Sequence, residues 1–509
     1  MSLEEQKKRL QQRRAALSTP ADAARQHANN RLTAGERLKL LLDADSFEEF
    51  GAFARSPTMP DPRDRDGVIT GSGTVAGRRI FVYAQDFSYK GASIGEVHAR
   101  KIARTIELAL KTGSPVVGLL DSGGARIQEG IAGLDGGGEI FRLNTQASGV
   151  IPQISAILGP CAGIAVYSPA LTDFVLMAKD TSSMFITGPN VIRSVTGEEI
   201  DGESLGGARV HATRSGVAHF MEADEAATIQ RIQQILSYLP ANNQEAPPRV
   251  ATTDSAVREN PSLETLVPLE SSRAYNVKKV LSEVLDLDSL LEVHSQFAPN
   301  VVVGLGRLNG ETVGIVANQP MMLAGCIDIN AADKIARHVN FCDAFGIPIV
   351  NFVDVTGFLP GSKLEHNGII RHGAKVLYAY SRATVPKISL VMRKAFGGAY
   401  IALVSKDMGY DRVLAWPSAE IAVMGAEGAV GIVHRRELKQ AGNDPDLRQQ
   451  LTDAYRDEHL NPYVAAAQNR IDAVIEPAQT RKTLIRQLDM LRGKHETLPR
   501  PRKHGSIPL

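Results

Sequence analysis

The sequence predicts an α/β chain made of two copies of one domain, with a helical extension before the first copy. Its 509 residues exceed what one ordinary hydrophobic core covers. Glycines and their neighbours recur at a nearly constant offset, from Gly71 to Gly304 and onward. Within each copy, apolar strands alternate with amphipathic helices, a pattern typical of layered α/β folds. We therefore expect one domain over residues 1–250 and a second over residues 251–509.

The repeat can be followed residue by residue. At an offset of 233 residues the same residue types recur in both copies, starting from Gly71, Gly73, Gly77, Ala84, residues 101–104 (KIAR), Gly113, Pro115, Asp121 and Gly124. The offset then drifts, as small loop insertions would cause. Later matches are Pro152 with Pro386, Gly163 with Gly398, Asp173 with Asp411 and Gly188 with Gly425. Coincidence would not keep one register through so many Gly and Pro positions, so the chain is predicted to be a duplication.

The expected elements follow one order. Residues 1–49 are mostly helical, and the run LTAGERL from Leu32 is typical of a capped helix start. Each copy opens with two strands around a glycine turn, at residues 73–86 and 306–319. The first copy continues with a helix (96–111), an apolar strand (115–120), a second helix, a strand (153–158), a short helix and a strand (173–177). The polar, Pro-rich residues 241–261 are predicted to be the linker.

Composition argues against several classes of function. With a net charge of +1, nothing favours binding to nucleic acid or to an anionic membrane. Cys161, Cys326 and Cys342 are far apart and lack metal-ligand spacing, so neither a disulfide framework nor a metal site is expected. The N-terminus has no apolar signal region, and no apolar run reaches about 18 residues. We therefore expect a cytoplasmic protein with no membrane insertion.

Four glycine-rich turns that follow apolar strands are the candidate sites. They begin at Asp121 (DSGGARIQ) and Gly159 (GPCAGIA) in the first copy, and at Asp354 (DVTGFLPG) and Arg393 (RKAFGGAY) in the second. Glycine lets the backbone approach a ligand closely, and the free N–H groups of a following helix point at negative charge. The phosphate-binding, nucleophile-elbow and zinc-protease motifs are absent. The turns therefore indicate two similar pockets that each stabilise an oxyanion.

At these turns the sequence resembles a known family. The motifs that carry the resemblance in the first copy are residues 83–87 (YAQDF), 95–98 (GEVH), 121–130 (DSGGARIQEG), 148–155 (SGVIPQIS), 159–163 (GPCAG), 184–189 (MFITGP) and 206–209 (GGAR). In the second copy they are residues 317–321 (ANQPM), 357–361 (GFLPG), 367–375 (NGIIRHGAK), 393–400 (RKAFGGAY), 422–426 (AVMGA) and the tail 503–509 (KHGSIPL). With them the chain resembles the carboxyltransferase (β) subunits of biotin-dependent acyl-CoA carboxylases, the propionyl-CoA and acetyl-CoA carboxylase class.

The resemblance implies a fold, partners and a reaction. The two copies would be crotonase-like domains of ββα spirals, assembled into a hexamer that is a dimer of trimers. The enzyme would transfer CO₂ from carboxybiotin to the α-carbon of a short-chain acyl-CoA, propionyl-CoA or acetyl-CoA, through an enolate. Acyl-CoA would bind the first domain, and biotin the second domain of a facing subunit. A partner (α) subunit would carry the biotin and the biotin carboxylase, and no metal is expected on this chain.

The resemblance also implies site residues. By motif, the backbone N–H groups of Gly163 and Ile164 would hold the acyl-CoA enolate, and those of Gly398 and Ala399 the ureido oxygen of biotin. The residues that would line the two pockets are Gly123, Gly124, Ala125, Arg126, Tyr167, Gly357, Phe358, Tyr400 and Ile401. Relatives commonly have a second glycine at Ile164. An ordinary backbone there is expected, because a β-branched residue tolerates a positive φ poorly.

Three alternatives remain open. The chain could serve a methylmalonyl-CoA decarboxylase or a transcarboxylase, whose sequences would look nearly the same. It could be a catalytically silent crotonase-like scaffold. A hydratase would need an acidic pair over the pocket, for which Glu129 is the nearest candidate. Histidines such as His98 are expected on helix surfaces.

Overall fold

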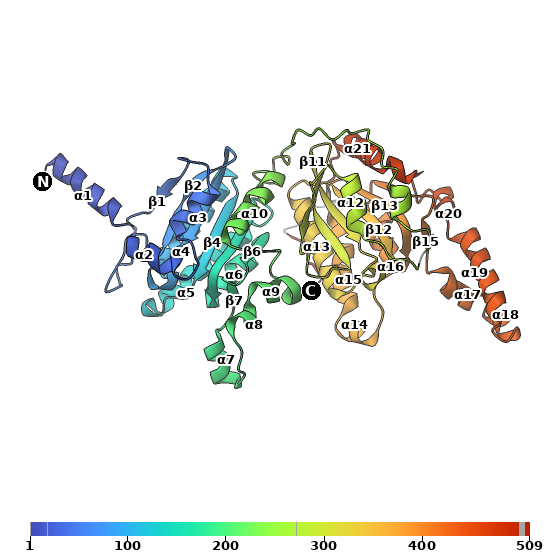
Figure 1. Cartoon of the computed structure of the whole chain (residues 1–509), viewed down its shortest axis with the longest axis horizontal. Coiled ribbons are helices and arrows are strands. Elements are labelled where there is room, and N and C mark those ends of the chain that lie inside the picture. The colour runs from blue at the N-terminus through green and yellow to red at the C-terminus, as the bar shows by residue number, and fades with distance from the viewer. Residues whose placement is uncertain (1, 18, 271, 498–503, 509) are drawn as a thin grey trace. The chain divides into compact units, whose positions relative to one another are not determined.

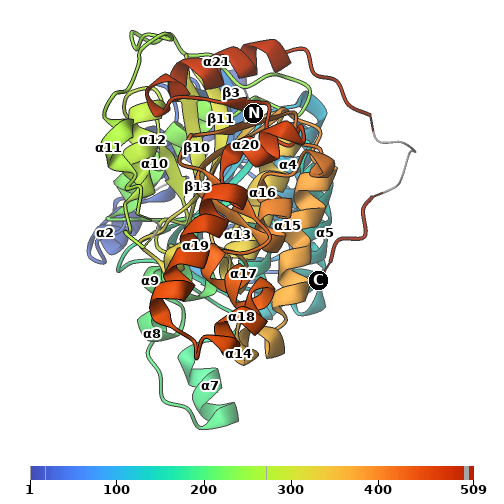
Figure 2. The ribbon, with the colours of Figure 1, turned by 90° about the vertical axis from the view of Figure 1, so that its right-hand side faces the viewer.

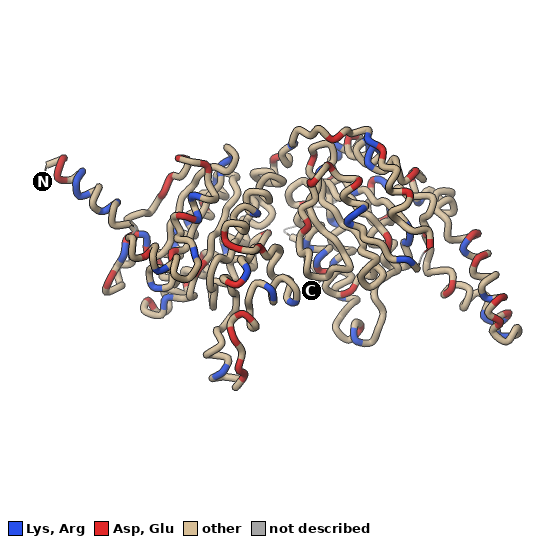
Figure 3. Tube along the Cα trace, viewed as in Figure 1, with Lys and Arg blue, Asp and Glu red and all other residues tan. Residues whose placement is uncertain are grey.

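The computed structural model describes residues 2–17, 19–270, 272–497 and 504–508 and divides into two compact units (Figure 1). Unit 1 is Met1–Glu245 and unit 2 is Ala246–Leu509. Within the tail motif, Lys503 and Leu509 lie outside the described residues. Acidic and basic residues are interspersed along both units, as expected for a mixed, solvated surface (Figure 3). Among the described residues, no helix combines the length and the apolar character that a membrane crossing requires.

The extension is helical, as predicted. It comprises α1 (Leu3–Ala15), α2 (Pro20–His27) and α3 (Ala34–Leu41). The predicted helix start is confirmed at Thr33, whose side chain accepts from the amide of Glu36 while the Glu36 carboxylate accepts from the amide of Thr33. Helix α1 buries no residue, whereas α3 buries Arg37, Leu38 and Leu41 against unit 1. The third helix is thus part of the folded unit.

Unit 1 is built on a mixed sheet. Its strands are β1 (Glu48–Phe50), β2 (Val68–Val75), β3 (Arg78–Gln85), β4 (Val116–Ser122), β5 (Gln153–Ala162), β6 (Phe174–Ala178), β7 (Ser183–Phe185) and β8 (Phe220–Glu222). The order is β1-β2-β3-β4-β5-β6-β8, and β7 pairs with the end of β5. The first three strands are antiparallel and the rest pair in parallel. Strand β2 begins five residues before the expected strand.

Helices cover this sheet. After the extension they are α4 (Glu96–Thr112), α5 (Ile131–Ala147), α6 (Tyr167–Ala170), α7 (Pro189–Thr196), α8 (Gly202–Gly206), α9 (Ala208–Val210) and α10 (Glu225–Tyr238), with short turns η1 (Lys90–Ala92), η2 (Ile127–Glu129), η3 (Gly163–Val166) and η4 (His211–Ser215). The predicted helix over residues 96–111 is confirmed as α4. It buries Ile102, Ile106 and Ala109 in the main core of the unit.

Unit 2 repeats this topology. Its strands are β9 (Leu291–Val293), β10 (Val301–Leu308), β11 (Glu311–Asn318), β12 (Ile349–Val355), β13 (Lys387–Phe396), β14 (Arg412–Ala415), β15 (Glu420–Ala422) and β16 (Ala473–Val474). They run in the order β9-β10-β11-β12-β13-β14-β16, with β15 on the end of β13. Both sheets therefore have the same connectivity, which confirms the duplicated α/β architecture.

The helices of unit 2 include a group between β15 and β16, α17 to α20, that the repeat did not predict. They are α11 (Leu263–Leu266), α12 (Val277–Val284), α13 (Ile329–Ala344), α14 (Ser362–His366), α15 (Ile369–Arg382), α16 (Gly397–Leu403), α17 (Ala426–Val433), α18 (Arg435–Gln440), α19 (Pro445–His459), α20 (Pro462–Ala467) and α21 (Thr480–Leu491), with short turns η5 (Leu323–Gly325), η6 (Lys406–Met408) and η7 (Pro477–Gln479). Figure 2 shows α17, α18 and α19 gathered as one group of helices. Residues 241–261 contain neither helix nor strand, as expected of a linker.

The structure corrects one match in the repeat. In the parallel pairs, Ser122 stands opposite Cys161 and Val355 opposite Ala395, which fixes an offset of 234 between β5 and β13. The glycine after each strand has the same left-handed backbone, with φ of 60° at Gly163 and 59° at Gly397. Gly163 therefore corresponds to Gly397, and the predicted match with Gly398 is wrong by one residue. Two adjacent glycines in the second copy made the positions indistinguishable from sequence.

Candidate functional site

The turn after β5 is the centre of the candidate site in unit 1. Gly163 ends the strand with φ of 60°, a conformation that L-residues rarely adopt. It starts the single turn η3, and the preceding Ala162 offers no side-chain cap. The first N–H groups of such a turn lack partners within the helix. Ile164 is not among the described residues with positive φ, so its backbone is ordinary, as expected.

The loop after β4 lies against this turn. The Gly123 amide donates to Gly91 O (2.9 Å), and the Ile94 amide donates to Gly124 O (2.7 Å). A Cβ on Gly124 would lie 2.7 Å from Ala162 O and 3.9 Å from the Cα of Gly163. Only glycine permits this approach. The predicted residues Gly123, Gly124 and Gly163 are therefore brought together as a backbone surface.

Ala125, Arg126 and Tyr167 take different places. Ala125 bridges to Ile94, which anchors the loop. The Arg126 guanidinium is fully buried and donates to Asp66, Ser93 O and Glu129. These hydrogen bonds hold the loop in place and leave the guanidinium turned away from the turn after β5. Tyr167 begins α6, is 45% exposed and meets the ring of Phe141 edge-on at 6.0 Å. Of these three side chains, Arg126 is buried, Ala125 is half-buried and Tyr167 is exposed.

Unit 2 presents the equivalent turn at the start of α16. Gly397 is followed by Gly398 and Ala399 in the first helical turn, and the preceding Phe396 supplies no side-chain cap. The loop after β12 is anchored as in unit 1, because Ile327 donates to Gly357 O (3.0 Å) and accepts from Leu359 (2.9 Å).

Three predicted side chains surround this second turn. The Phe358 ring lies 3.7 Å from where a Cβ of Gly398 would be. Tyr400 is half-buried, and Ile401 is 49% exposed. Uncharged amide donors beside an aromatic ring suit an uncharged ring system that carries a carbonyl acceptor.

A buried ion-pair cluster holds the strand ends in unit 1. Arg37 of α3 is 1% exposed and donates to Asp121 (3.3 Å), to Glu225 (2.7 Å) and to Leu158 O (3.2 Å). Asp121 lies next to the end of β4 and Leu158 lies in the middle of β5, the two strands that precede the turns. Burial raises the pKa of Asp121 to about 6, although Arg37 and Arg31 lower it. The extension thus fixes both turns from behind.

In unit 2 the equivalent carboxylate is held by a residue of the sheet itself. Asp354, the counterpart of Asp121, accepts from Arg393 (3.0 Å) on the neighbouring strand β13. Behind α16, Asn351 donates to Leu403 O (3.0 Å) and to the Tyr410 hydroxyl (2.8 Å), and it accepts from Tyr380 (2.7 Å). Sequence reasoning missed Arg37, Asn351 and their partners. The only available signal was a polar residue inside an apolar strand, as at Asn351.

Neither Glu129 nor His98 is free to act as a base beside the first turn. Glu129 accepts from the Glu96 amide (2.7 Å) and from Arg126 (2.9 Å). Burial alone would raise the pKa of Glu129, but these hydrogen bonds lower it overall. The expectation for His98 is wrong: its ring is fully buried, donates from Nδ1 to Asp66 O (2.9 Å) and contacts the Gln85 amide through Nε2 (3.3 Å). Burial, aided by Arg126, lowers the pKa of His98 to about 3.

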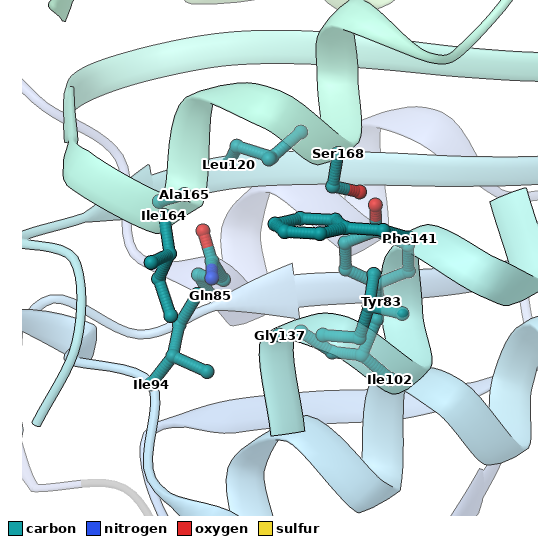
Figure 4. A pocket seen from close by; sticks show the side chains of 11 residues that line it. Tyr83, Gln85, Ile94, Ile102, Leu120, Gly137, Phe141, Ile164, Ala165 and Ser168 are labelled. Carbon is teal, nitrogen blue, oxygen red and sulfur yellow. The ribbon is translucent and has the colours of Figure 1, made fainter. Parts of the chain in front are cut away.

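An apolar pocket lies beneath the first turn (Figure 4). It is small: the cavity volume open to a water-sized group is only about 10 Å³. Ile164, Ala165 and Ile94 lie on one side of it, and Phe141 lies across from them. Among the described residues, no cluster of three or more His, Cys, Asp or Glu side chains is arranged to hold a metal ion.

Comparisons with known proteins agree with this geometry. The carboxyl transferase domain family matches residues 25–507. The propionyl-CoA carboxylase carboxyltransferase subunit of Haloferax mediterranei is 54% identical over 492 residues, covering 96% of this chain and 95% of that protein. The methylmalonyl-CoA decarboxylase subunit alpha of Veillonella parvula is 51% identical over 490 residues, covering 95% and 94%.

Solved structures extend the likeness to the fold. A crystal structure of transcarboxylase 12S, a hexamer with methylmalonyl-CoA and methylmalonic acid bound, superposes with a TM-score of 0.95 at 48% identity. It covers all of this chain and 98% of that one. The predicted crotonase-like fold of both units is confirmed. The chain belongs to the carboxyl transferase family, as a carboxyltransferase subunit of the biotin-dependent acyl-CoA carboxylase class.

Proposed function

We propose that this chain transfers CO₂ from carboxybiotin to the α-carbon of a short-chain acyl-CoA, propionyl-CoA or acetyl-CoA. The observation that carries the proposal is the duplicated turn. Gly163 and Gly397 stand at the same register with the same φ, each opens an uncapped helical turn, and each is followed by amides without intrahelical acceptors. A carboxyl transfer between two carbonyl-bearing reactants needs two such oxyanion sites.

In unit 1 the amides of Gly163 and Ile164 would hold the thioester oxygen. Loss of the α-proton places negative charge on that oxygen, and fixed N–H donors stabilise it without reorganisation. One such donor is worth roughly 3 kcal/mol of barrier. The N–H of Ile164 is available because its side chain turns into the apolar pocket. The backbone of Gly123 and Gly124 would line the approach to the thioester.

In unit 2 the amides of Gly398 and Ala399, the first two after Gly397, would hold the ureido oxygen of biotin, one residue further along the turn than Gly163 and Ile164 in unit 1. Gly357, Phe358 and Tyr400 would line the ring of biotin, and Ile401 would line the acyl pocket near biotin. Biotin supplies the carboxyl group when it is bound. The aromatic ring of Phe358 and the uncharged donors fit such a ligand. The buried network of Asn351, Tyr380 and Tyr410 keeps α16 in place, which steadies these donors.

The partners and the setting complete the proposal. A separate α subunit would carry biotin and the biotin carboxylase, and this chain would form a hexamer, a dimer of trimers, in the cytoplasm. Support for the hexamer comes from the transcarboxylase 12S assembly. The identity to a methylmalonyl-CoA decarboxylase subunit supports decarboxylation as the second candidate function. Retention of both turns speaks against a silent scaffold.

The test uses the purified chain. Malonyl-CoA, methylmalonyl-CoA and ethylmalonyl-CoA are each supplied with and without free biotin, and loss of the carboxyl group is followed. Gly398→Pro removes one donor and should abolish biotin-dependent turnover while leaving assembly intact. Gly398→Ala is the matched control, since it keeps the N–H and its Cβ would sit at an ordinary 3.7 Å from Phe358. A proline variant with most of its activity would remove the role assigned to this turn.

A further inference from the structure

The apolar pocket of unit 1 is walled by both loops of the candidate site. Ile164 and Ala165 directly follow Gly163 in the turn. Ile94 accepts from the Arg126 amide (2.9 Å) and donates to Gly124 O (2.7 Å), so it is held by the glycine loop. Helix α5 supplies Gly137 and Phe141 on the other side (Figure 4). The pocket therefore adjoins the turn whose backbone would hold the thioester.

The lining of the pocket favours the binding of a hydrocarbon group. Every lining residue is uncharged. Its few polar groups already have partners. Gln85 accepts from the Asp121 amide (3.1 Å) and contacts His98, Ser168 donates to Asn144 (2.9 Å), and the Tyr83 hydroxyl is hydrogen-bonded to Ser168 and Ser155. A polar or charged group placed here would lose its hydration without gaining hydrogen bonds, which is unfavourable. An apolar chain would lose only water contacts.

Ile164 limits the depth of this pocket. A Cβ built on Gly137 would lie 3.2 Å from the Ile164 Cδ1 and 3.7 Å from the Phe141 ring. The glycine in α5 thus makes room for the isoleucine, and the two positions share one space. Neighbouring Gly138 differs, since a Cβ there would meet nothing within 4 Å. Helix α5 therefore offers one glycine that shapes the pocket and one that does not.

We propose that this pocket receives the hydrocarbon tail of the acyl group and that Ile164 sets the length of tail that it admits. The proposal rests on the proposed function, and it deepens it by naming the residue that limits the length of the acyl group. In unit 2 the corresponding space beside the turn is taken by the Phe358 ring, which lies 3.2 Å from a Cβ position on Gly373. This difference assigns tail binding to unit 1.

The test measures a ratio in four variants of the full chain. Ile164→Ala removes three carbon atoms but keeps the N–H, and Gly137→Ala fills the same space from α5. The readout is the kcat/KM for ethylmalonyl-CoA divided by that for methylmalonyl-CoA, in biotin-dependent decarboxylation. One methylene in an apolar pocket changes selectivity by about 10–200-fold. We expect the ratio to rise at least tenfold in Ile164→Ala and to fall in Gly137→Ala. The double variant should lie between them, and Gly138→Ala should match wild type.

Binding provides a second readout that needs neither biotin nor a partner. Affinities of acetyl-, propionyl-, butyryl- and hexanoyl-CoA are measured by calorimetry on the same proteins. Wild-type turnover with an unchanged ratio in both Ile164→Ala and Gly137→Ala would overturn the inference and leave the proposed function standing. Absence of wild-type turnover would count against the proposed function. In that case an unchanged order of chain-length affinities in the variants would still overturn the role of Ile164.

Discussion

Replacing Arg37 by methionine should loosen unit 1 and leave unit 2 unaffected. The side chain is 1% exposed and neutralises two buried carboxylates, Asp121 and Glu225. Removing one partner of a buried ion pair costs about 3–5 kcal/mol. Asp121 keeps Arg31 at 3.2 Å, and Glu225 keeps the Leu32 amide at 3.2 Å, so the lower end applies. We expect a loss of about 3 kcal/mol in the free energy of local opening.

Amide hydrogen exchange followed by mass spectrometry measures this loss segment by segment. A change of about 3 kcal/mol corresponds to exchange that is roughly 100-fold faster. It should appear in peptides covering α3, the end of β4 and the start of α10. The matched control is Arg393→Met, which removes the partner of Asp354 and should act in unit 2 alone. Arg37→Lys should be intermediate, because it keeps the charge without the planar fork. Unchanged exchange in unit 1, or equal acceleration in both units, would refute the reasoning.

Two further predictions concern buried cations and the pH. His98 is neutral in the folded state, with a pKa of about 3 that lies below its unfolded value of about 6.5. Its contribution to the stability of the folded state is therefore complete above pH 6.5 and is lost as the pH falls. Between pH 7.5 and 5, the free energy of local opening of α4 should fall by about 2 kcal/mol in the wild type but not in His98→Gln. Amide hydrogen exchange in α4 measures this fall, and parallel pH profiles of the two proteins would contradict the prediction. Lys334 donates to four backbone carbonyls, of His294, Phe297, Ala298 and Val301, whereas Lys101 donates to two. Because each orphaned buried acceptor costs about 1–3 kcal/mol, Lys334→Met should destabilise unit 2 more than Lys101→Met destabilises unit 1 in urea unfolding.

The duplication was predictable because glycines, prolines and strand-end aspartates are fixed by backbone geometry, which both copies share. Asp173 and Asp411 illustrate this, since each accepts from the first amide of the adjacent strand. The match of Gly163 with Gly398 failed because sequence cannot show which of two adjacent glycines has a positive φ. The early start of β2 was missed because Gly71 and Gly73 weaken its strand pattern.

The candidate site was predictable in its backbone and less so in its supports. Arg37 and His98 look like surface residues on amphipathic helices. Their burial depends on partners that lie far away in sequence, with Glu225 188 residues from Arg37 and Asp66 32 residues from His98. Arg126 belongs to a recognisable motif, yet its direction was not readable from that motif. The role of each depends on tertiary contacts that only the fold creates.

The contact between Arg37 and Glu225 also constrains the order in which the chain can fold. Synthesis proceeds from the N-terminus, so α3 leaves the ribosome long before its partner in α10. Until residue 225 emerges, the guanidinium of Arg37 cannot reach its final set of acceptors, and the ends of β4 and β5 lack their support. Unit 1 therefore completes its folding only when nearly all of its residues have been made, so nascent chains that stop before α10 should remain sensitive to proteases.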